Sequence, residues 1–339
     1  MSICIDCHAH FLPEAFTAEM TKRGFIEMHR DEGYIMVGDA LTGYSREKAR
    51  LPDFSLLYDI EERAALAKQQ RIDKQIICLP PFWFGYKPDA QTGLAICRAG
   101  NDAIAATIKQ SPERFAGFAT VPLQSPKDAV AELKRAVEEL GFWGAEIGTS
   151  IAGKPMDDPA LDIFWQACCE LDVPLFVHPQ HELASDRTAQ YYLHNLYGNP
   201  SETALFAARM IFAGVFERFP KLNMILAHGG GTIPYIIGRL DHGHRVRPET
   251  KSLPKPPSTY LKQLYFDTIT HDDAMLAYLV SRVSAKHVVV GTDRPFDMGI
   301  DDPYALVEKI PGLSASDRDA ILGDNARSFL SRSMPLAKS

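Results

Sequence analysis

The chain has 339 residues, which is enough for two domains of average size or for one large α/β barrel. Hydrophobic residues make up 46% of it and charged residues 23%, the balance of a globular protein with a well-filled core. The formal net charge is −7 and no block of Lys and Arg occurs, so the composition argues against nucleic acid as a partner. The composition does not exclude a small anionic substrate, because a few local arginines can set the charge of a pocket.

The N-terminal residues MSICIDCHAHFLPE lack the basic stretch and the long apolar stretch that signal peptides carry. No segment approaches the ~20 consecutive apolar residues of a membrane-spanning helix. The six cysteines are scattered, and Cys4-x-x-Cys7 has no second Cys pair to complete a structural zinc site, so buried reduced thiols are the favoured interpretation. These features predict a cytoplasmic location and no membrane partner.

Short apolar runs alternate with amphipathic stretches along the chain. The apolar runs predict eight strands buried on both faces, at Ile3–His8, Gln75–Leu79, Phe115–Val121, Gly144–Gly148, Pro174–His178, Asn223–His228, Leu264–Asp267 and His287–Thr292. The amphipathic stretches predict helices, at Ile60–Gln70, Gly93–Lys109, Asp128–Leu140, Pro159–Leu171, Glu202–Phe216 and Asp272–Val283. This alternation predicts an α/β protein with the (β/α)₈ TIM barrel fold, as a single domain over residues 1–339. The alternative, a doubly wound open sheet, would need a Gly-rich phosphate turn after its first strand, where this chain has His-Ala-His.

Two segments interrupt the alternation. Phe11–Phe54 is mixed in composition and only weakly periodic, so it is interpreted as an excursion between the first strand and its helix. Asp241–Tyr260 is rich in Pro, Lys and Arg, which predicts a surface loop inserted after the sixth strand.

Ligand-type side chains end several of the predicted strands, where the reactive groups of a (β/α)₈ barrel gather. They are His8 and His10 on strand one, His178 on strand five, His228 on strand six and Asp293 on strand eight. Alternate residues of a strand point to the same side, so His8 and His10 can face the barrel mouth together. A single histidine there is more often structural, but three imidazoles and a carboxylate together suit one divalent ion such as Zn²⁺, with a position left open. His228, outside the ligand set, could then transfer protons.

The stretches IDCHAHFLP, LFVHP, AHGGG and GTDRPF resemble motifs of the amidohydrolase superfamily. The likeness covers nearly the whole chain, through RFAGFATVP, LGFWGAEIGT, GVFERFPKL and GRLDHG, and lies with the branch of α-amino-β-carboxymuconate-ε-semialdehyde decarboxylase and related aromatic-acid decarboxylases. The resemblance implies that His8, His10, His178 and Asp293 bind zinc. It also implies that His228 activates the metal-bound water and handles the proton, which makes His228 and Asp293 the expected catalytic residues.

The resemblance further implies substrate-binding arginines. In that family an arginine at the position of Arg239 reaches the pocket of the neighbouring subunit and holds a substrate carboxylate, which implies a homodimer. A second arginine comes from the excursion after strand one, where Arg46 and Arg50 are both candidates.

The chain departs from the family at two strand ends. Strand four reads GAEIGT, with Glu146 where many amidohydrolases carry a lysine that bridges two metals. One ion is therefore expected, and a bridging role for Glu146 is the alternative. Arg294 follows Asp293 where the decarboxylases usually carry an aromatic residue. It binds a substrate carboxylate if it points into the mouth, and is a surface charge if it points out.

Aromatic and histidine residues of the loops are further candidates. Trp83, in the run Phe82-Trp83-Phe84, and the pair Tyr191-Tyr192 offer walls for a planar substrate, although core or interface packing explains them equally well. His181 is expected in a surface loop, with a place in the pocket lining as the alternative, and three more histidines are expected to be structural or solvent-exposed: His242, His244 and His271.

These residues predict a metal-dependent non-oxidative decarboxylase, a carboxy-lyase, that acts on an unsaturated or aromatic carboxylic acid. A hydrolase or hydratase of the same superfamily is the first alternative, because both chemistries need a Lewis acid, a base and a dry pocket. A metal-stabilised binding protein without activity is the second.

Overall fold

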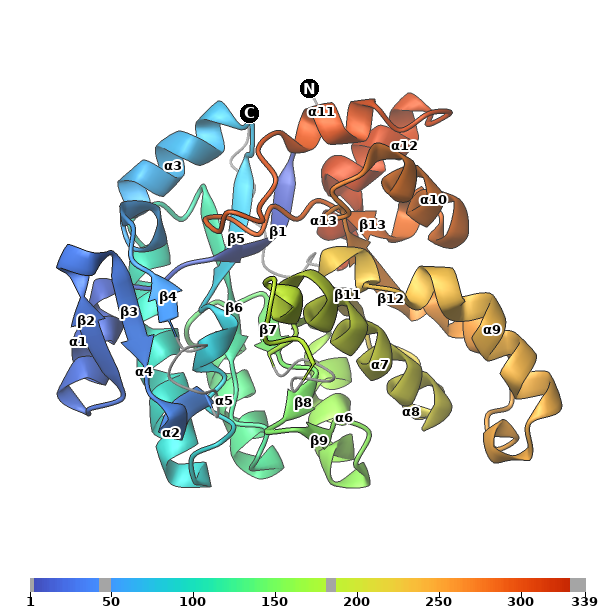
Figure 1. The fold of residues 1–339 in the computed structure, drawn as a ribbon, viewed down its shortest axis with the longest axis horizontal. Coiled ribbons are helices and arrows are strands. Elements are labelled where there is room, and N and C mark those ends of the chain that lie inside the picture. Colours follow the sequence, from blue (N-terminus) through green and yellow to red (C-terminus); the bar gives the residue numbers. More distant parts are fainter. Residues whose placement is uncertain (1–2, 43–49, 181–186, 330–339) are drawn as a thin grey trace.

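The computed structural model shows eight parallel strands side by side in one sheet, surrounded by helices (Figure 1). It describes residues 3–42, 50–180 and 187–329. In their order across the sheet, the strands are β1 (Ile5–His10), β5 (Lys74–Cys78), β6 (Phe115–Thr120), β7 (Gly144–Ile147), β10 (Leu175–Val177), β11 (Met224–Leu226), β12 (Leu264–Asp267) and β13 (Val288–Val289). Each strand overlaps one of the eight predicted ones, so the predicted (β/α)₈ barrel is confirmed.

The first and last strands meet through hydrogen bonds between β1 and the residues that follow β13. The amide of Cys7 donates to the carbonyl of Val290 at 2.9 Å, and the amide of Asp293 donates to the carbonyl of His8 at 2.8 Å. Asp6, fully buried on β1, accepts hydrogen bonds from the amide of Thr292 at 3.0 Å and from its hydroxyl at 2.6 Å. These contacts bring the two ends of the sheet together around a filled interior.

A bulge in β1 sets the direction of its histidines. The register with β5 shifts between Asp6 and Ala9. Ile5 and Cys7 belong to the cluster of apolar side chains inside the barrel, and the ring of His8 lies 4.7 Å from that of Phe176 in the same cluster. An extra residue in a strand reverses which side chains face inward beyond it. The bulge therefore turns His8 and His10 into the interior at the mouth of the barrel.

The outer helices cover the strands much as predicted, with one helix divided. The principal ones are α3 (Ile60–Gln69), α4 (Ala90–Ile108), α5 (Pro126–Glu138), α6 (Asp162–Leu171), α7 (Asn199–Phe212), α8 (Val215–Arg218), α9 (Ile233–Val246), α10 (Asp273–Val283), α11 (Pro303–Glu308), α12 (Ala315–Asp319) and α13 (Asn325–Phe329). The predicted helix Glu202–Phe216 is wrong at its C-terminal end. It stops at Phe212, because Gly214 adopts a left-handed φ of 69° and α8 begins after it.

The excursion after strand one folds into a helix and a small sheet of its own. It includes α1 (Glu14–Lys22) and an antiparallel sheet of β2 (Ile26–His29), β3 (Tyr34–Val37) and β4 (Arg50–Pro52), which lies beside the barrel (Figure 1). Buried Ile35 and Leu51 pack this sheet into the main core. The excursion thus brings β4 to the barrel mouth.

The predicted surface loop Asp241–Tyr260 is wrong at both ends. Helix α9 continues to Val246, and a 3₁₀ helix (η8) covers Pro257–Gln263. Of the basic side chains that suggested a loop, Arg245 is exposed on α9, which projects from the barrel (Figure 1), and Arg247, Lys251 and Lys255 are exposed on the segment that follows it. No helix in the described part of the chain is both long enough and apolar enough to cross a membrane.

Candidate metal centre

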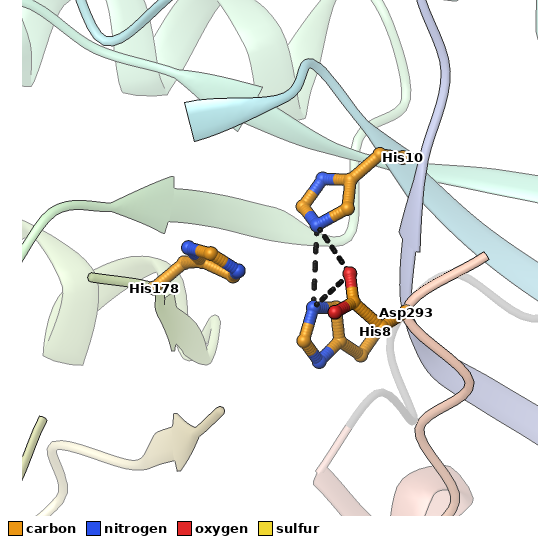
Figure 2. Close-up of side chains that lie close together, drawn as sticks. All are labelled: His8, His10, His178 and Asp293. Atoms are coloured by element: carbon orange, nitrogen blue, oxygen red, sulfur yellow. Dashed lines mark hydrogen bonds and ion pairs between the residues drawn. The ribbon is translucent and has the colours of Figure 1, made fainter. Parts of the chain in front are cut away.

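Four metal-type donors converge at the barrel mouth from three strand ends (Figure 2). His8 and His10 lie on β1, His178 directly follows β10, and Asp293 lies beyond β13. All four residues are buried, and one donor atom from each lies within 4.8 Å of the donor atoms of the others. Figure 2 shows the side chains pointing toward one another, with His178 across from the other three.

The distances within the cluster fit a shared cation. The Nε2 atoms of His8 and His10 are 3.2 Å apart, and Asp293 Oδ1 lies 3.3 Å from the first and 3.2 Å from the second. Ligands about 2.0–2.1 Å from a tetrahedral ion are separated from one another by about 3.4 Å. Nitrogen and oxygen atoms that face one another this closely need a proton or a metal ion between them.

Hydrogen bonds on the far sides of two rings select the nitrogen that faces the cluster. His8 Nδ1 donates to Asp267 Oδ2 at 2.7 Å, and His178 Nδ1 donates to the carbonyl of Pro179 at 2.8 Å. Each acceptor holds a proton on Nδ1, so Nε2 is the nitrogen of both rings that can bind a metal ion. This arrangement of outer acceptors is typical of metal-binding histidines.

Asp267 is a functional residue that the sequence analysis did not identify. Besides His8, it accepts backbone hydrogen bonds from His228 at 3.0 Å, Gly229 at 2.7 Å and Ile269 at 3.0 Å. One carboxylate therefore positions both a metal-type ligand and the loop that carries His228. A sequence signal was present, because Asp267 ends the apolar strand β12 as the other candidates end theirs.

The charges of the cluster are unevenly distributed. Burial opposes protonation of His8, but Asp293 and Asp267 raise its pKa to about 10. Burial lowers the pKa of His10, and it lowers that of His178 well below the ordinary value, helped by His228 and His10. Burial alone would raise the pKa of Asp293, but His8 and hydrogen bonds from neighbouring histidines hold it well below its ordinary value. A proton on His8 thus occupies the place that a divalent ion would take.

His228 stands beside the four donors without being one of them. It follows β11 and opens a His-Gly-Gly-Gly turn in which its own φ is 56°. A side chain at Gly231 would collide with the carbonyl of Pro200, so this tight turn requires glycine there. His228 Nε2 lies 3.7 Å from Asp293 Oδ2, and its Nδ1 has no hydrogen-bond partner among the described residues. The Nε2 atom of the ring therefore faces the four donors.

A cavity of about 350 Å³ opens over the cluster, a volume suited to a small organic molecule. Its floor includes His10, His178, His228 and Asp293. Its walls combine polar and aromatic side chains, among them Arg50, Phe82, Gln180, Tyr192, His194, Asn195, Asn199 and Phe296.

Only some of the predicted substrate-binding residues line the cavity. Arg50 lines the cavity, and its guanidinium lies 4.4 Å from the centre of the Tyr34 ring. Arg239 is exposed on α9 and does not line the cavity. Arg46 and His181 lie outside the described residues.

Two of those predictions need correction. Trp83 is fully buried in the core against Phe16, with the ring centres 4.9 Å apart, and its neighbour Phe82 lines the cavity instead. The two residues share a 3₁₀ turn, in which consecutive side chains point in different directions. Arg294 does not line the cavity either. It forms an ion pair with Asp301 and donates from Nε to the carbonyl of Ile300 at 3.3 Å.

The comparisons with known proteins agree with this geometry. A family model described as amidohydrolase matches residues 5–332. The 2-amino-3-carboxymuconate-6-semialdehyde decarboxylase of Dictyostelium discoideum is 34% identical, over 97% of this chain and 92% of that protein. The 2-keto-4-carboxy-3-hexenedioate hydratase of Sphingobium sp. is 27% identical, over 98% of this chain and 97% of its own. The crystal structure of a dihydroxybenzoic acid decarboxylase from Polaromonas sp., with bound manganese and 2-nitroresorcinol, is 27% identical, with a TM-score of 0.79 over 98% of this chain and 97% of that one.

The barrel and its cluster of imidazoles and carboxylate define a metal-dependent enzyme with its site at the strand ends. The chain belongs to the amidohydrolase family, in the branch of the 2-amino-3-carboxymuconate-6-semialdehyde decarboxylases.

Proposed function

We propose that the protein is a metal-dependent non-oxidative decarboxylase of an unsaturated or aromatic carboxylic acid. The observation that carries this proposal is the convergence of His8, His10, His178 and Asp293 beneath a small cavity, which His10, His178 and Asp293 line together with His228. The relatives named for decarboxylation support the choice of reaction. A cytoplasmic location is part of the proposal, and the six thiols, none of which forms a disulfide, support it.

A divalent ion held by those four residues would supply a Lewis acid that polarises a substrate oxygen. We propose Zn²⁺, because three of the four donors are imidazole nitrogens. The manganese in the Polaromonas relative makes Mn²⁺ the alternative.

His228 is the proposed acid–base residue. Loss of CO₂ breaks the bond between the carboxylate carbon and the adjacent carbon, and the electron pair stays on that adjacent carbon. That carbon takes up one proton, so the carboxylate and a proton yield the product and CO₂. His228 lies on the cavity floor with its Nε2 3.7 Å from Asp293 Oδ2, and can deliver this proton. Arg50, on the cavity wall, would hold the anionic end of the substrate.

Replacement of His228 tests this role. We expect His228→Asn to lower kcat by roughly 10²–10⁴-fold, the usual contribution of a general acid–base residue. Its metal content should equal that of the wild type, because His228 is outside the four-donor group. The matched control is His242→Asn, an exposed histidine on α9, which should keep full activity. Equal activity of the His228 variant and the wild type would contradict the assignment.

The reaction is tested by mass-resolved products of the purified, metal-analysed protein. The screen covers hydroxybenzoates, aminobenzoates and carboxymuconate semialdehydes. A product lighter by CO₂ supports decarboxylation. A product heavier by one water, or two fragments that sum to that mass, would establish the hydratase or hydrolase alternative, which the Sphingobium relative favours.

We also propose a homodimer in which Arg239 holds the substrate carboxylate in the partner's cavity. Arg239 is exposed on α9, one turn beyond Tyr235, which is 79% exposed. Co-expression of Arg239→Ala chains with His228→Asn chains tests this arrangement. A mixed dimer then contains one cavity with both native residues, so part of the activity should return. If Arg239 acts in its own cavity, no mixed dimer has an intact site and no activity returns.

A further inference from the structure

A second group of metal-type donors lies behind the metal centre. It consists of His10, Cys78 and Glu146, at the ends of the strands β1, β5 and β7, and at most 1% of each residue is exposed. Glu146 pairs in register with Phe176, whose ring contacts His8 inside the barrel, so the Glu146 side chain also points inward. His10 lines the cavity, whereas Cys78 and Glu146 do not. The group is therefore reached past His10.

The three donors are spaced for one small cation. Cys78 Sγ lies 3.7 Å from His10 Nδ1, and all three donor atoms lie within 4.8 Å of one another. Donors about 2.0–2.3 Å from a tetrahedral ion are separated by about 3.3–3.8 Å, so movements of about 1 Å would complete the coordination. The set has one nitrogen, one sulfur and one oxygen.

The surroundings of the Glu146 carboxyl group are a second observation, independent of the donor spacing, that points to a missing cation. Neither of its carboxyl oxygens has a well-formed hydrogen bond among the described residues, and the Cys78 thiol is the one side chain near enough to offer a weak one, although Glu146 is fully buried. The nearby Cys78 thiol directs its own hydrogen bond to the carbonyl of Ala9, at 3.4 Å. A buried carboxyl group without partners is costly, and proteins keep such groups where an ion, a water molecule or a functional role compensates.

We propose that His10 Nδ1, Cys78 Sγ and the Glu146 carboxylate form a second cation site, for a thiophilic divalent ion such as Zn²⁺. His10 then bridges the two sites, since its Nε2 faces the metal centre and its Nδ1 faces Cys78. The sulfur donor selects Zn²⁺ over hard ions such as Mn²⁺ and Mg²⁺. Binding releases the protons of the Cys78 thiol, of His10 and of the buried Glu146 carboxyl group to solvent, and the resulting negative charges offset the repulsion between the two cations.

This site differs from the bridged pair considered for strand four. Glu146 is not one of the four donors of the metal centre, so it does not bridge two ions at the mouth. The second site lies deeper, and it is independent of which reaction the enzyme catalyses.

Titration of the metal-free, full-length protein with Co²⁺ tests the proposal, because a Co²⁺–thiolate bond gives a charge-transfer band in the near ultraviolet. The four donors of the metal centre include no sulfur. We therefore expect no such band with the first equivalent and a thiolate band with the second. Native mass spectrometry in excess Zn²⁺ should show two ions per chain. A wild-type protein that binds one ion and never develops the band would overturn the proposal.

Three variants locate the second ion. Cys78→Ser should lose the band, and Glu146→Gln should weaken the second equivalent by about tenfold or more. Cys97→Ser is the matched control, because Cys97 is fully buried on α4 and outside both donor groups, and it should keep the band. A band that survives in Cys78→Ser would overturn the assignment. If that variant does not fold, Glu146→Gln decides alone, since unchanged second-equivalent affinity would contradict the site.

Discussion

At the scale of single residues, Asp267 links metal binding by His8 to the position of the proposed acid–base residue, His228. Asp267 Oδ2 accepts a hydrogen bond from His8 Nδ1, and both carboxylate oxygens accept hydrogen bonds from amides of the turn that begins at His228. A carboxylate in this position keeps the lone pair of His8 Nε2 directed at the metal and makes the ring more basic. It also holds the acid–base residue at a constant distance from the ligands.

Replacement of this carboxylate should weaken metal binding. In Asp267→Asn the side chain has one acceptor oxygen in place of two and no charge, so we expect a loss of metal affinity of roughly 10–100-fold. Competition with a chromophoric chelator measures the loss. Asp302→Asn is the control, because Asp302 is an exposed N-cap of α11 and asparagine caps equally well. Unchanged affinity in Asp267→Asn would show that His8 does not depend on this acceptor.

The sequence was informative about ligands and less so about the residues around them. His8, His178 and Asp293 could be predicted because a polar residue at the end of an apolar strand is conspicuous. Asp267 also ends an apolar strand, but it is not part of any of the motifs that pointed to the other residues. The directions of Trp83 and Arg294 could not be predicted, since they depend on the phase of a short turn and on an ion pair with Asp301.

At the scale of secondary-structure elements, closure of the barrel depends on a few contacts between β1 and the residues that follow β13. β13 is only two residues long, and the link from β1 continues through residues beyond it. Asp6 supplies much of this link, because it accepts hydrogen bonds from Thr292, from the amide of His8 at 3.1 Å and from the Gln75 side chain at 2.7 Å. Four donors around one buried carboxylate leave no room for a donor in its place.

Asp6→Asn should therefore destabilise the fold. The new amide group would place a donor against the donors of Thr292 and Gln75, so we expect a loss of about 2–4 kcal/mol in the free energy of unfolding. Urea denaturation of the metal-free protein measures it. Asp272→Asn, at the exposed N-cap of α10, should change this free energy little. Equal stability of the two variants would exclude a closing role for Asp6.

The long elements were predictable and the short ones were not. The eight strands and most helices follow from apolar periodicity. The sheet of β2, β3 and β4 has strands of three or four residues, too short to show an alternating pattern. The bulge in β1 was also hidden, because it depends on pairing with β5 and not on local residue preference.

The stability of the whole metal-free molecule should depend on pH in a defined way. The folded-state pKa of His8, about 10, lies above the unfolded value of about 6.5, so its contribution is complete below pH 6.5 and is lost as the pH rises through 10. His10 and His178 have lowered folded-state pKa values, so they cost stability as the pH falls below about 6.5. The metal-free protein should be most stable near neutral pH.

Denaturant unfolding across a pH series, with and without metal, checks this expectation. A bound ion replaces the proton on His8, so the part of the alkaline loss that His8 causes should disappear in the loaded protein, whereas the part caused by buried thiols such as Cys7 should remain. A metal-free protein that is equally stable at pH 7 and pH 10 would contradict the charge distribution of the cluster.

The ligands of the metal centre come from the first and the last parts of the barrel, since His8 and His10 lie on the first barrel strand and Asp293 lies beyond the last. During synthesis the first two ligands emerge long before the fourth, so the centre cannot be completed until the last barrel strand and the residues after it have left the ribosome. Once bound, the ion acts as a cross-link between the two ends of the barrel. Metal loading should thus be a late event of maturation that also locks β1 against the residues that follow β13.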